Sequence, residues 1–190
     1  MSAELPPLEL WLVRHGETIR NSDGRLSGWQ DVPLTELGRE QARWLRPHLA
    51  GQRFEGVWSS DLARAVETAE LAFGPARADA RLREIGFGEL EGVPFLEIPE
   101  ALQRGLLDFE GFQAPGGEGV ADLEGRLRAF LAELQPGRHL VFSHGGAIRA
   151  LTRALGENRF LPNGSLAVVD WSARRLRRVV ENELAHRFGG

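Results

Sequence analysis

The chain has 190 residues, 42% of them hydrophobic, and a formal net charge of −4 at pH 7. This length and composition predict one globular domain with an ordinary core, and the charge offers no basic surface for nucleic acid and no polybasic run for a membrane. The chain has no cysteine, and all 23 of its strongly basic residues are arginine, which excludes disulfides, thiolate nucleophiles, cysteine-ligated zinc and mechanisms that need a lysine.

The first seven residues lack both a positively charged region and a long apolar stretch. We therefore expect no signal peptide there. No later apolar run approaches the roughly 20 residues that a membrane-spanning helix needs. These features lead us to expect a soluble, cytoplasmic protein with neither a membrane nor a nucleic acid among its partners.

The first predicted strand runs from Leu8 to Val13 and leads directly into Arg14-His15-Gly16. An apolar run that ends at glycine is typical of a buried strand. A polar, glycine-rich loop follows up to about residue 29, and Thr35 is then a good N-cap for a helix. Because proline has no backbone N–H to donate inside a helix, Pro47 should end or kink this helix early.

The middle of the chain continues the alternation of strands and helices. Residues 54–59 are predicted to form the second strand, and a helix follows from about Asp61 to Phe73. A third, weaker strand is expected near residues 78–82. Residues 93–116 mix apolar, acidic and glycine residues without a clear period, which indicates a helical insertion or lid. Apolar residues at three- and four-residue spacing over 120–134 predict an amphipathic helix.

Another apolar strand, residues 139–143, leads into His144-Gly145-Gly146, and a helix follows. Residues 165–171 and 176–180 are expected to pair as a hairpin. The sequence shows no repeat, linker or low-complexity tract. We therefore predict a single α/β domain over residues 1–190, a three-layer sandwich with a mostly parallel central sheet flanked by helices and a short helical lid insertion at about 93–116.

Two of the predicted strands end in a histidine beside a glycine. Because open α/β sheets bind ligands beyond the carboxyl ends of their strands, we expect His15 and His144 to face one another across one pocket. Arg14 lies beside the first histidine, and Arg64 is in the first turn of the helix after the second strand. The helix that opens at Gly145 adds free N–H groups. This combination is typical of a phosphate site rather than a carboxylate or sugar site.

Six motifs along the chain occur in the order seen in a known family. They are LVRHGET, GRLSGWQDVPLTELGREQA, WSSDLARAVETA, LREIGFGELEG, PGGEG and VFSHGG. Over about residues 8–171 the chain resembles the histidine phosphatase superfamily, the phosphoglycerate-mutase-like group. The resemblance implies phosphoryl transfer through a phosphohistidine, with no metal and no other cofactor.

The resemblance also implies roles for single residues. His15 matches the nucleophile that takes the phosphoryl group, and Glu84 matches the acid that protonates the leaving oxygen and later activates water. The expected phosphate contacts come from Arg14, Asn21, Ser27, Gly28, Arg64, His144 and the Gly145 N–H. An imidazole attacks only through an unprotonated nitrogen, so its other nitrogen must be held as a donor, typically by a backbone carbonyl.

Two points stay open in the sequence. Glu17, Glu89 and Glu91 are nearby carboxylates that could replace Glu84 as the acid. Members of the family often carry a tryptophan where this chain has Arg20. At the pocket mouth Arg20 would favour an anionic substrate, and the alternative is an ordinary surface arginine.

The lid favours hydrolysis over mutase chemistry. A mutase must retain a phosphorylated acid, which calls for additional cations, but this segment carries four carboxylates against the single cation Arg104. We therefore expect a metal-independent phosphomonoesterase acting on a small-molecule phosphate ester, similar to the α-ribazole phosphatases of cobalamin assembly or to broad-specificity phosphatases. Apolar lid residues would contact a hydrophobic substrate or pack on the core. We expect a monomer or homodimer.

Three alternatives remain at this stage. The first is a phosphoglycerate mutase-type transfer. The second is a catalytically inactive module that binds a phosphate ligand. The third is a metal-dependent hydrolase with His15, His144 and a carboxylate as ligands.

Overall fold

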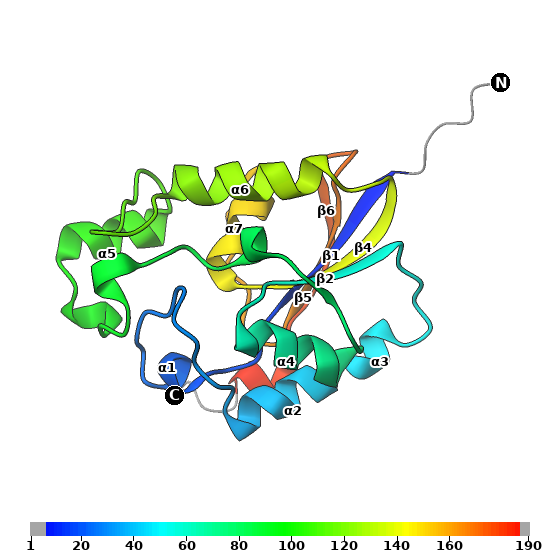
Figure 1. Ribbon diagram of the computed structural model, residues 1–190, viewed down its shortest axis with the longest axis horizontal. Helices are drawn as coiled ribbons and strands as arrows, with labels where there is room; N and C mark the ends of the chain where they lie inside the picture. The colour runs from blue at the N-terminus through cyan, green and yellow to red at the C-terminus, as the bar shows by residue number, and fades with distance from the viewer. Residues whose placement is uncertain (1–6, 187–190) are drawn as a thin grey trace.

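The computed structural model describes residues 7–186, and its centre is a six-stranded sheet (Figure 1). The strands lie in the order β3-β2-β4-β1-β5-β6. The first four run parallel to one another, and β5 and β6 are antiparallel to their neighbours. From β1 to β6 the strands span Leu8–Arg14, Gly56–Ser59, Arg77–Ala78, Gly137–Ser143, Leu166–Asp170 and Arg175–Val180. The prediction of a mostly parallel sheet is confirmed.

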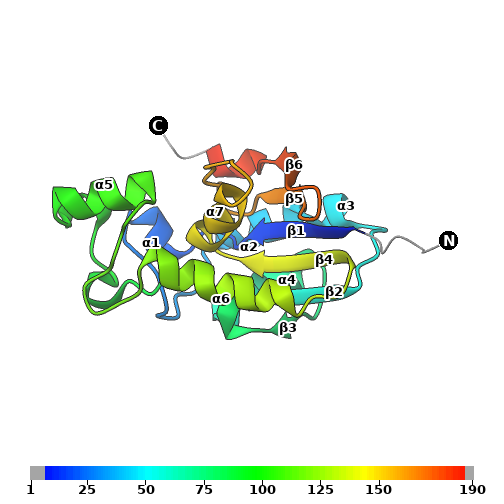
Figure 2. The same cartoon turned by 90° about the horizontal axis from the view of Figure 1, so that it is seen from above.

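Helices cover both faces of this sheet, which makes three layers. α6 and α7 lie on one face, and α2, α3 and α4 lie on the other (Figure 1, Figure 2). From α1 to α7 the helices span Ile19–Ser22, Glu36–Trp44, Arg46–Leu49, Ala63–Ala72, Glu100–Asp108, Val120–Ala132 and Gly145–Arg153. Short 3₁₀ helices lie at Ala80–Leu82, Gly88–Leu90, Phe95–Glu97 and Glu183–His186. No helix within residues 7–186 has the length and apolar character to cross a membrane.

The side chains of β1 contribute to the hydrophobic core on both faces of the sheet. Successive side chains of a strand point to opposite faces of the sheet. Leu10 and Leu12 accordingly belong to the core under α6 and α7, and Trp11 and Val13 belong to the core under α2, α3 and α4. All four are buried. A strand that is apolar on both faces is typical of a sheet covered by helices on both sides.

The boundaries of α2 follow the signals in its sequence. Thr35 caps the helix, because its hydroxyl accepts the N–H of Gly38 at 3.0 Å. The predicted effect of Pro47 is confirmed: α2 stops at Trp44, and residues Arg46–Leu49 form the separate short helix α3.

The three elements that follow α3 are shorter than predicted. β2 begins at Gly56 and α4 at Ala63. The prediction of a third strand near residues 78–82 is wrong for most of that range, because β3 has two residues and a 3₁₀ turn follows it. The carboxylate of Asp79 accepts the N–H of Arg81 at 2.9 Å, and this cap starts the turn.

The insertion at 93–116, called the lid below, contains α5 and lies beyond the carboxyl ends of the parallel strands (Figure 1). It is joined to α7. The guanidinium of Arg149 donates to the carbonyls of Leu106 and Leu107, and that of Arg153 donates to the carbonyl of Asp108. The last carbonyls of a helix have no partner within it, so these two arginines satisfy the end of α5 and hold it beside α7.

Candidate active site

The two histidines come together because their strands are neighbours. β1 and β4 are parallel and paired, with Arg14 opposite Ser143. The next residue along each strand is a histidine, so His15 and His144 lie side by side at one edge of the sheet. Their ring centroids are 5.1 Å apart and the rings meet edge to face. The exposed fractions of the two residues are 4% and 0%.

The hydrogen bond of His15 determines which of its nitrogens is free. Nδ1 lies 2.7 Å from the carbonyl oxygen of Gly16. Because a carbonyl oxygen can only accept, Nδ1 carries the proton and Nε2 keeps its lone pair. Burial, together with the charges of Arg64 and Arg14, lowers the pKa of His15 well below its usual value. The imidazole is therefore neutral at pH 7, and the lone pair of Nε2 is available as a nucleophile.

Two buried arginines lie next to the histidines. Arg64, in the first turn of α4, donates through Nη2 to the carbonyl of Gly28 at 2.6 Å and through Nη1 to that of Gln30 at 3.1 Å. Arg14 donates through Nη1 to the carbonyl of Leu161 at 2.5 Å. Burial lowers the pKa of both arginines, that of Arg14 to about 10. A pKa of about 10 still leaves Arg14 positively charged at neutral pH.

His144 is fully buried. Burial, with added contributions from Arg64 and His15, lowers its pKa well below the usual value. Neither ring nitrogen of His144 has a hydrogen-bond partner. A neutral imidazole keeps one N–H, so this ring has a donor ready for an anionic oxygen.

Buried polar atoms without partners are confined to this region. In the described part of the chain they are five side-chain atoms, namely Nε of Arg14, Nε of Arg64, both ring nitrogens of His144 and Oγ of Ser27. An unpaired buried polar atom costs about 1–3 kcal/mol, so folded proteins rarely keep several of them together. Unpaired donors gathered in one buried region can bind an oxyanion such as a phosphoryl group. We call Arg14, His15, Arg64 and His144 the phosphate cluster.

Glu84 reaches this cluster from the segment after the 3₁₀ turn. Its Oε1 accepts the N–H of Ile85 at 2.8 Å, and its Oε2 accepts the N–H of Gly146 at 2.9 Å. A Cβ atom at position 146 would lie 2.3 Å from Oε1 of Glu84. Only glycine at this position lets the carboxyl group rest on the first turn of α7.

The other three candidate acids have different positions. Glu91 accepts the N–H groups of Gly28 and Trp29 and pairs with Arg20 at 3.2 Å. Glu17 accepts the hydroxyl of Thr35. Glu84 lines the cavity described below, whereas Glu17, Glu89 and Glu91 do not. The geometry therefore favours Glu84 as the carboxyl group that meets substrate.

Asn21 and Ser27 line the same cavity. Oδ1 of Asn21 accepts from Thr18 and from Asn163. Its NH₂ group is thus the end that remains to donate to a phosphate. Asn163 also donates to the carbonyl of His15 at 3.1 Å. The sequence analysis did not select Asn163, although its position in a Pro-Asn-Gly turn just before the strand next to β1 was a usable signal.

Gly28 has a role that differs from the predicted phosphate contact. Its N–H is donated to Glu91 and its carbonyl accepts from Arg64, so it holds the arginine in place.

Arg20 is neither a free surface cation nor a free group at the pocket mouth, because it pairs with Glu91 and Gln30. Gly145 is the first residue of α7, and a Cβ atom there would lie 2.7 Å from the ring of Phe160.

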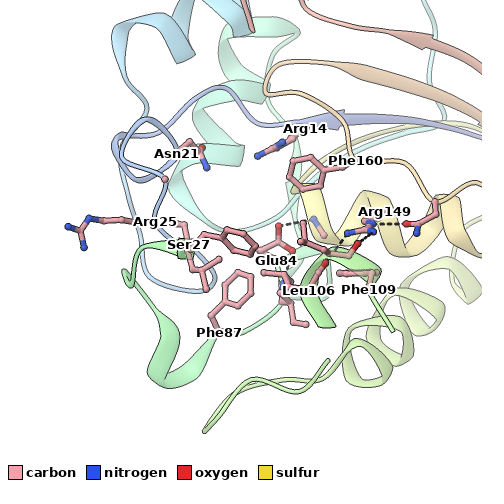
Figure 3. A pocket seen from close by; sticks show the side chains of 17 residues that line it. Arg14, Asn21, Arg25, Ser27, Glu84, Phe87, Leu106, Phe109, Arg149 and Phe160 are labelled. Carbon is pink, nitrogen blue, oxygen red and sulfur yellow. Dashed lines mark hydrogen bonds between the residues drawn. The ribbon is translucent and has the colours of Figure 1, made fainter. Parts of the chain in front are cut away.

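A cavity of about 530 Å³ has Arg14 of the phosphate cluster in its wall, whereas His15, Arg64 and His144 lie behind that wall (Figure 3). At its polar end lie Arg14, Asn21, Glu84 and Gly146. Its remaining walls are largely apolar and include Leu26, Ile85, Phe87, Phe95, Leu106, Leu107, Phe109 and Phe160. The ring of Phe160 lies on the guanidinium of Arg14, with 4.4 Å between the ring centroid and Cζ. Sequence periodicity gave no indication of Phe160 because it lies in an irregular loop.

Within the described residues, no group of three or more histidine, aspartate or glutamate side chains is arranged to hold a metal ion.

Comparisons with known proteins agree on one family. The family described as "Histidine phosphatase superfamily (branch 1)" matches residues 10–183. The chain is 37% identical over 183 residues to the "Probable phosphoglycerate mutase GpmB" of Yersinia pestis (strain Pestoides F), covering 86% of this chain and 85% of that protein.

Two solved structures have the same fold. One is a phosphoglycerate mutase from Thermus thermophilus, with a TM-score of 0.85 and 46% identity over 90% of this chain and 98% of that one. The other is described as a "putative alpha-ribazole-5'-P phosphatase" from Escherichia coli, with a TM-score of 0.79 and 31% identity over 94% of this chain and 97% of that one. The relatives thus carry the names of both a mutase and a phosphatase.

Proposed function

The chain belongs to the histidine phosphatase superfamily, and from this premise we propose that it is a phosphomonoesterase that hydrolyses a small-molecule phosphate ester through a phosphohistidine at His15. The observation that carries the proposal is the set of buried, unpartnered donors of Arg14, Arg64 and His144 around a neutral His15. In phosphoryl transfer the developing charge lies on the phosphoryl oxygens, so positioned donors supply most of the stabilisation.

The first step forms the phosphoenzyme. The lone pair of Nε2 of His15 attacks phosphorus, and the bond from phosphorus to the ester oxygen breaks. That oxygen takes a proton from Glu84 and leaves as an alcohol. The hydrogen bond from Nδ1 to Gly16 holds the ring in the tautomer that attack requires.

The second step regenerates the enzyme. A water molecule gives one proton to the Glu84 carboxylate and attacks phosphorus. The bond between phosphorus and Nε2 breaks, phosphate leaves, and His15 regains its lone pair. Glu84 is protonated again for the next cycle, so one carboxyl group serves both steps, as acid and then as base.

The cations of the cavity favour hydrolysis over mutase chemistry. Arg149 lines the wall, but its three nitrogens donate to the carbonyls of Leu106 and Leu107 and to Asn158. Arg25 donates to a backbone carbonyl and points away from Glu84 (Figure 3). The lid's Arg104 pairs with Glu100 on the surface. Each of these three arginines is thus already bonded to the protein itself, and this engagement supports weak retention of the second acidic group of a bisphosphorylated intermediate.

The apolar walls indicate the kind of ester that fits. Aromatic and aliphatic side chains surround the space next to the phosphate cluster, and such walls favour a substrate whose body is apolar or aromatic. An α-ribazole phosphate, with its aromatic base, has this character. The mutase alternative keeps support from the names of the Yersinia and Thermus relatives.

The test measures both activities on one preparation. We expect hydrolysis of α-ribazole phosphate and of aryl phosphates, an acid-labile phosphoenzyme on His15, and little interconversion of 2- and 3-phosphoglycerate. A label on serine or aspartate would contradict the mechanism. Efficient interconversion of the phosphoglycerates would instead support the mutase alternative, and phosphate binding without turnover would indicate the inactive module.

A further inference from the structure

The PGGEG motif, residues 115–119, takes no part in the reaction described above. Its glutamate, Glu118, forms an ion pair with Arg126 of α6 at 2.9 Å. The two side chains are 17% and 15% exposed. An ion pair that is shielded from water in this way needs further hydrogen bonds to offset the loss of hydration.

Arg126 obtains these bonds from the segment that carries Glu84. Its Nη1 donates to the carbonyls of Arg81 and Arg83, both at 2.7 Å. Its Nη2 donates to the carbonyl of Glu84 at 2.7 Å, and Nε and Nη2 each donate to Glu118 at 2.9 Å. A guanidinium has five N–H donors, and all five are therefore used to join α6, the motif and the segment 81–84.

Glu118 completes the connection on the other side of Glu84. Its Oε2 accepts the N–H of Gly86 at 2.9 Å, and its own N–H donates to the carbonyl of Gly86 at 2.7 Å. The backbones approach closely, since a Cβ atom at Gly117 would lie 2.2 Å from that carbonyl oxygen. A glycine at position 117 is thus needed for the hydrogen bonds between Glu118 and Gly86.

We propose that Arg126 and Glu118 are positioning residues that hold the carboxyl group of Glu84 at the reacting phosphoryl group. The proposal rests on the proposed function, in which Glu84 gives a proton to the leaving oxygen. Arg126 binds the backbone immediately before and at Glu84, and Glu118 binds it two residues later. Neither side chain lines the cavity beside the phosphate cluster.

The proposal has a readout that general destabilisation does not share. A general acid matters most when the leaving oxygen is strongly basic, as in an alkyl phosphate, and matters little for 4-nitrophenyl phosphate, whose phenolate leaves without a proton. The value of kcat/KM reports the steps up to departure of this oxygen. A displaced Glu84 should therefore lower kcat/KM for the alkyl ester much more than for the nitrophenyl ester.

The experiment compares R126Q and E118Q with the wild-type chain on hexyl phosphate and 4-nitrophenyl phosphate. We expect kcat/KM for hexyl phosphate to fall by about 10- to 100-fold, a part of the 10²–10⁴ that a general acid supplies, with a change of less than about threefold for the nitrophenyl ester. E84Q is the reference, and it should show the same selectivity with a larger loss.

R81Q is the matched control. Arg81 joins the same segment to the end of α6 through Glu133, at 2.7 Å, but its side chain makes no bond to Glu84. We expect R81Q to leave the ratio of the two kcat/KM values unchanged. E118Q keeps the shape of the side chain and serves if R126Q does not fold.

Equal losses on the two esters in a folded variant that still forms phosphohistidine would overturn this proposal alone. If the wild-type chain formed no phosphohistidine, the proposed function would fall, and this proposal with it.

Discussion

At the ends of the strands, the phosphate cluster is buried and contains polar atoms that have no protein partner. In the lid, by contrast, the last carbonyls of α5 are bonded to arginines of α7, and two apolar side chains are exposed. Arg149 and Arg153 bond to carbonyls of α5, and Arg104 pairs with Glu100. Leu96 and Leu107 are 83% and 61% exposed. Since only unpaired donors can bind a new anion strongly, the strand ends suit the phosphoryl group and the lid suits the rest of the substrate.

Removing the nucleophile is expected to have the largest effect. H15A should lower kcat for 4-nitrophenyl phosphate by at least about 10³-fold, because the variant lacks the Nε2 atom that forms the phosphoenzyme in the proposed mechanism. Steady-state kinetics measure the loss, and far-ultraviolet circular dichroism should show an unchanged fold. H48A is the control, since His48 packs on Trp44 in the helical layer. More than a few per cent of residual activity in H15A would refute the assignment of the nucleophile.

A change in the lid should alter substrate choice rather than chemistry. Phe95 lines the cavity, whereas its neighbour Leu96 does not and is exposed. F95A should lower kcat/KM for an aryl phosphate about 10-fold, which corresponds to a loss of about 1.4 kcal/mol of apolar contact, and should leave glycerol phosphate nearly unchanged.

L96A is the matched control for F95A, and its kcat/KM values for the aryl and glycerol esters should equal those of the wild-type chain. Equal losses on the aryl and glycerol esters in F95A would show that the lid affects the phosphate cluster itself, and the contrast between the two regions would then fail.

The smallest expected effect is that of pH on the protonation of His15 and His144. Burial and the neighbouring arginines lower the pKa of His15 and His144, so both rings should stay neutral between pH 7.5 and pH 6. NMR of the ring carbons should show no titration in this range, whereas the urea-unfolded chain should titrate near pH 6.5.

This difference also has a consequence for stability. Below about pH 6.5 the unfolded chain binds protons that the native histidines do not, so the free energy of unfolding should decrease as pH falls through that range. Native rings that titrate at their ordinary pKa would contradict the buried, cationic character of the cluster.

Much of the fold was predictable because its signals are local. The N-cap at Thr35 and the break at Pro47 depend on hydrogen bonds within a few residues, and the apolar runs that became β1 and β4 are continuous. The third strand was overestimated because the Asp79 carboxylate starts a turn there, a competition between side chain and backbone that periodicity does not show.

The residues of the candidate site likewise include some that local sequence predicted and others that only the fold identified. Arg14, His15 and His144 were predictable because each follows directly from a strand, and parallel strands end at one edge of a sheet. The choice of Glu84 among four carboxylates needed the fold, since the four candidates are the same residue type and differ in whether they line the cavity. The role of Gly28 as a support for Arg64 also depends on contacts between residues 36 positions apart.

The sequence by itself determined the alternation of strands and helices, the family, and the two histidines at the strand ends, because each of these is written in contiguous residues. Only the tertiary structure decided which carboxyl group lies beside the phosphate cluster, that Arg149 is hydrogen-bonded to the lid, and that the PGGEG motif reaches Glu84 through Arg126. These features join segments that are far apart along the chain, and their geometry depends on how the helices pack against the sheet.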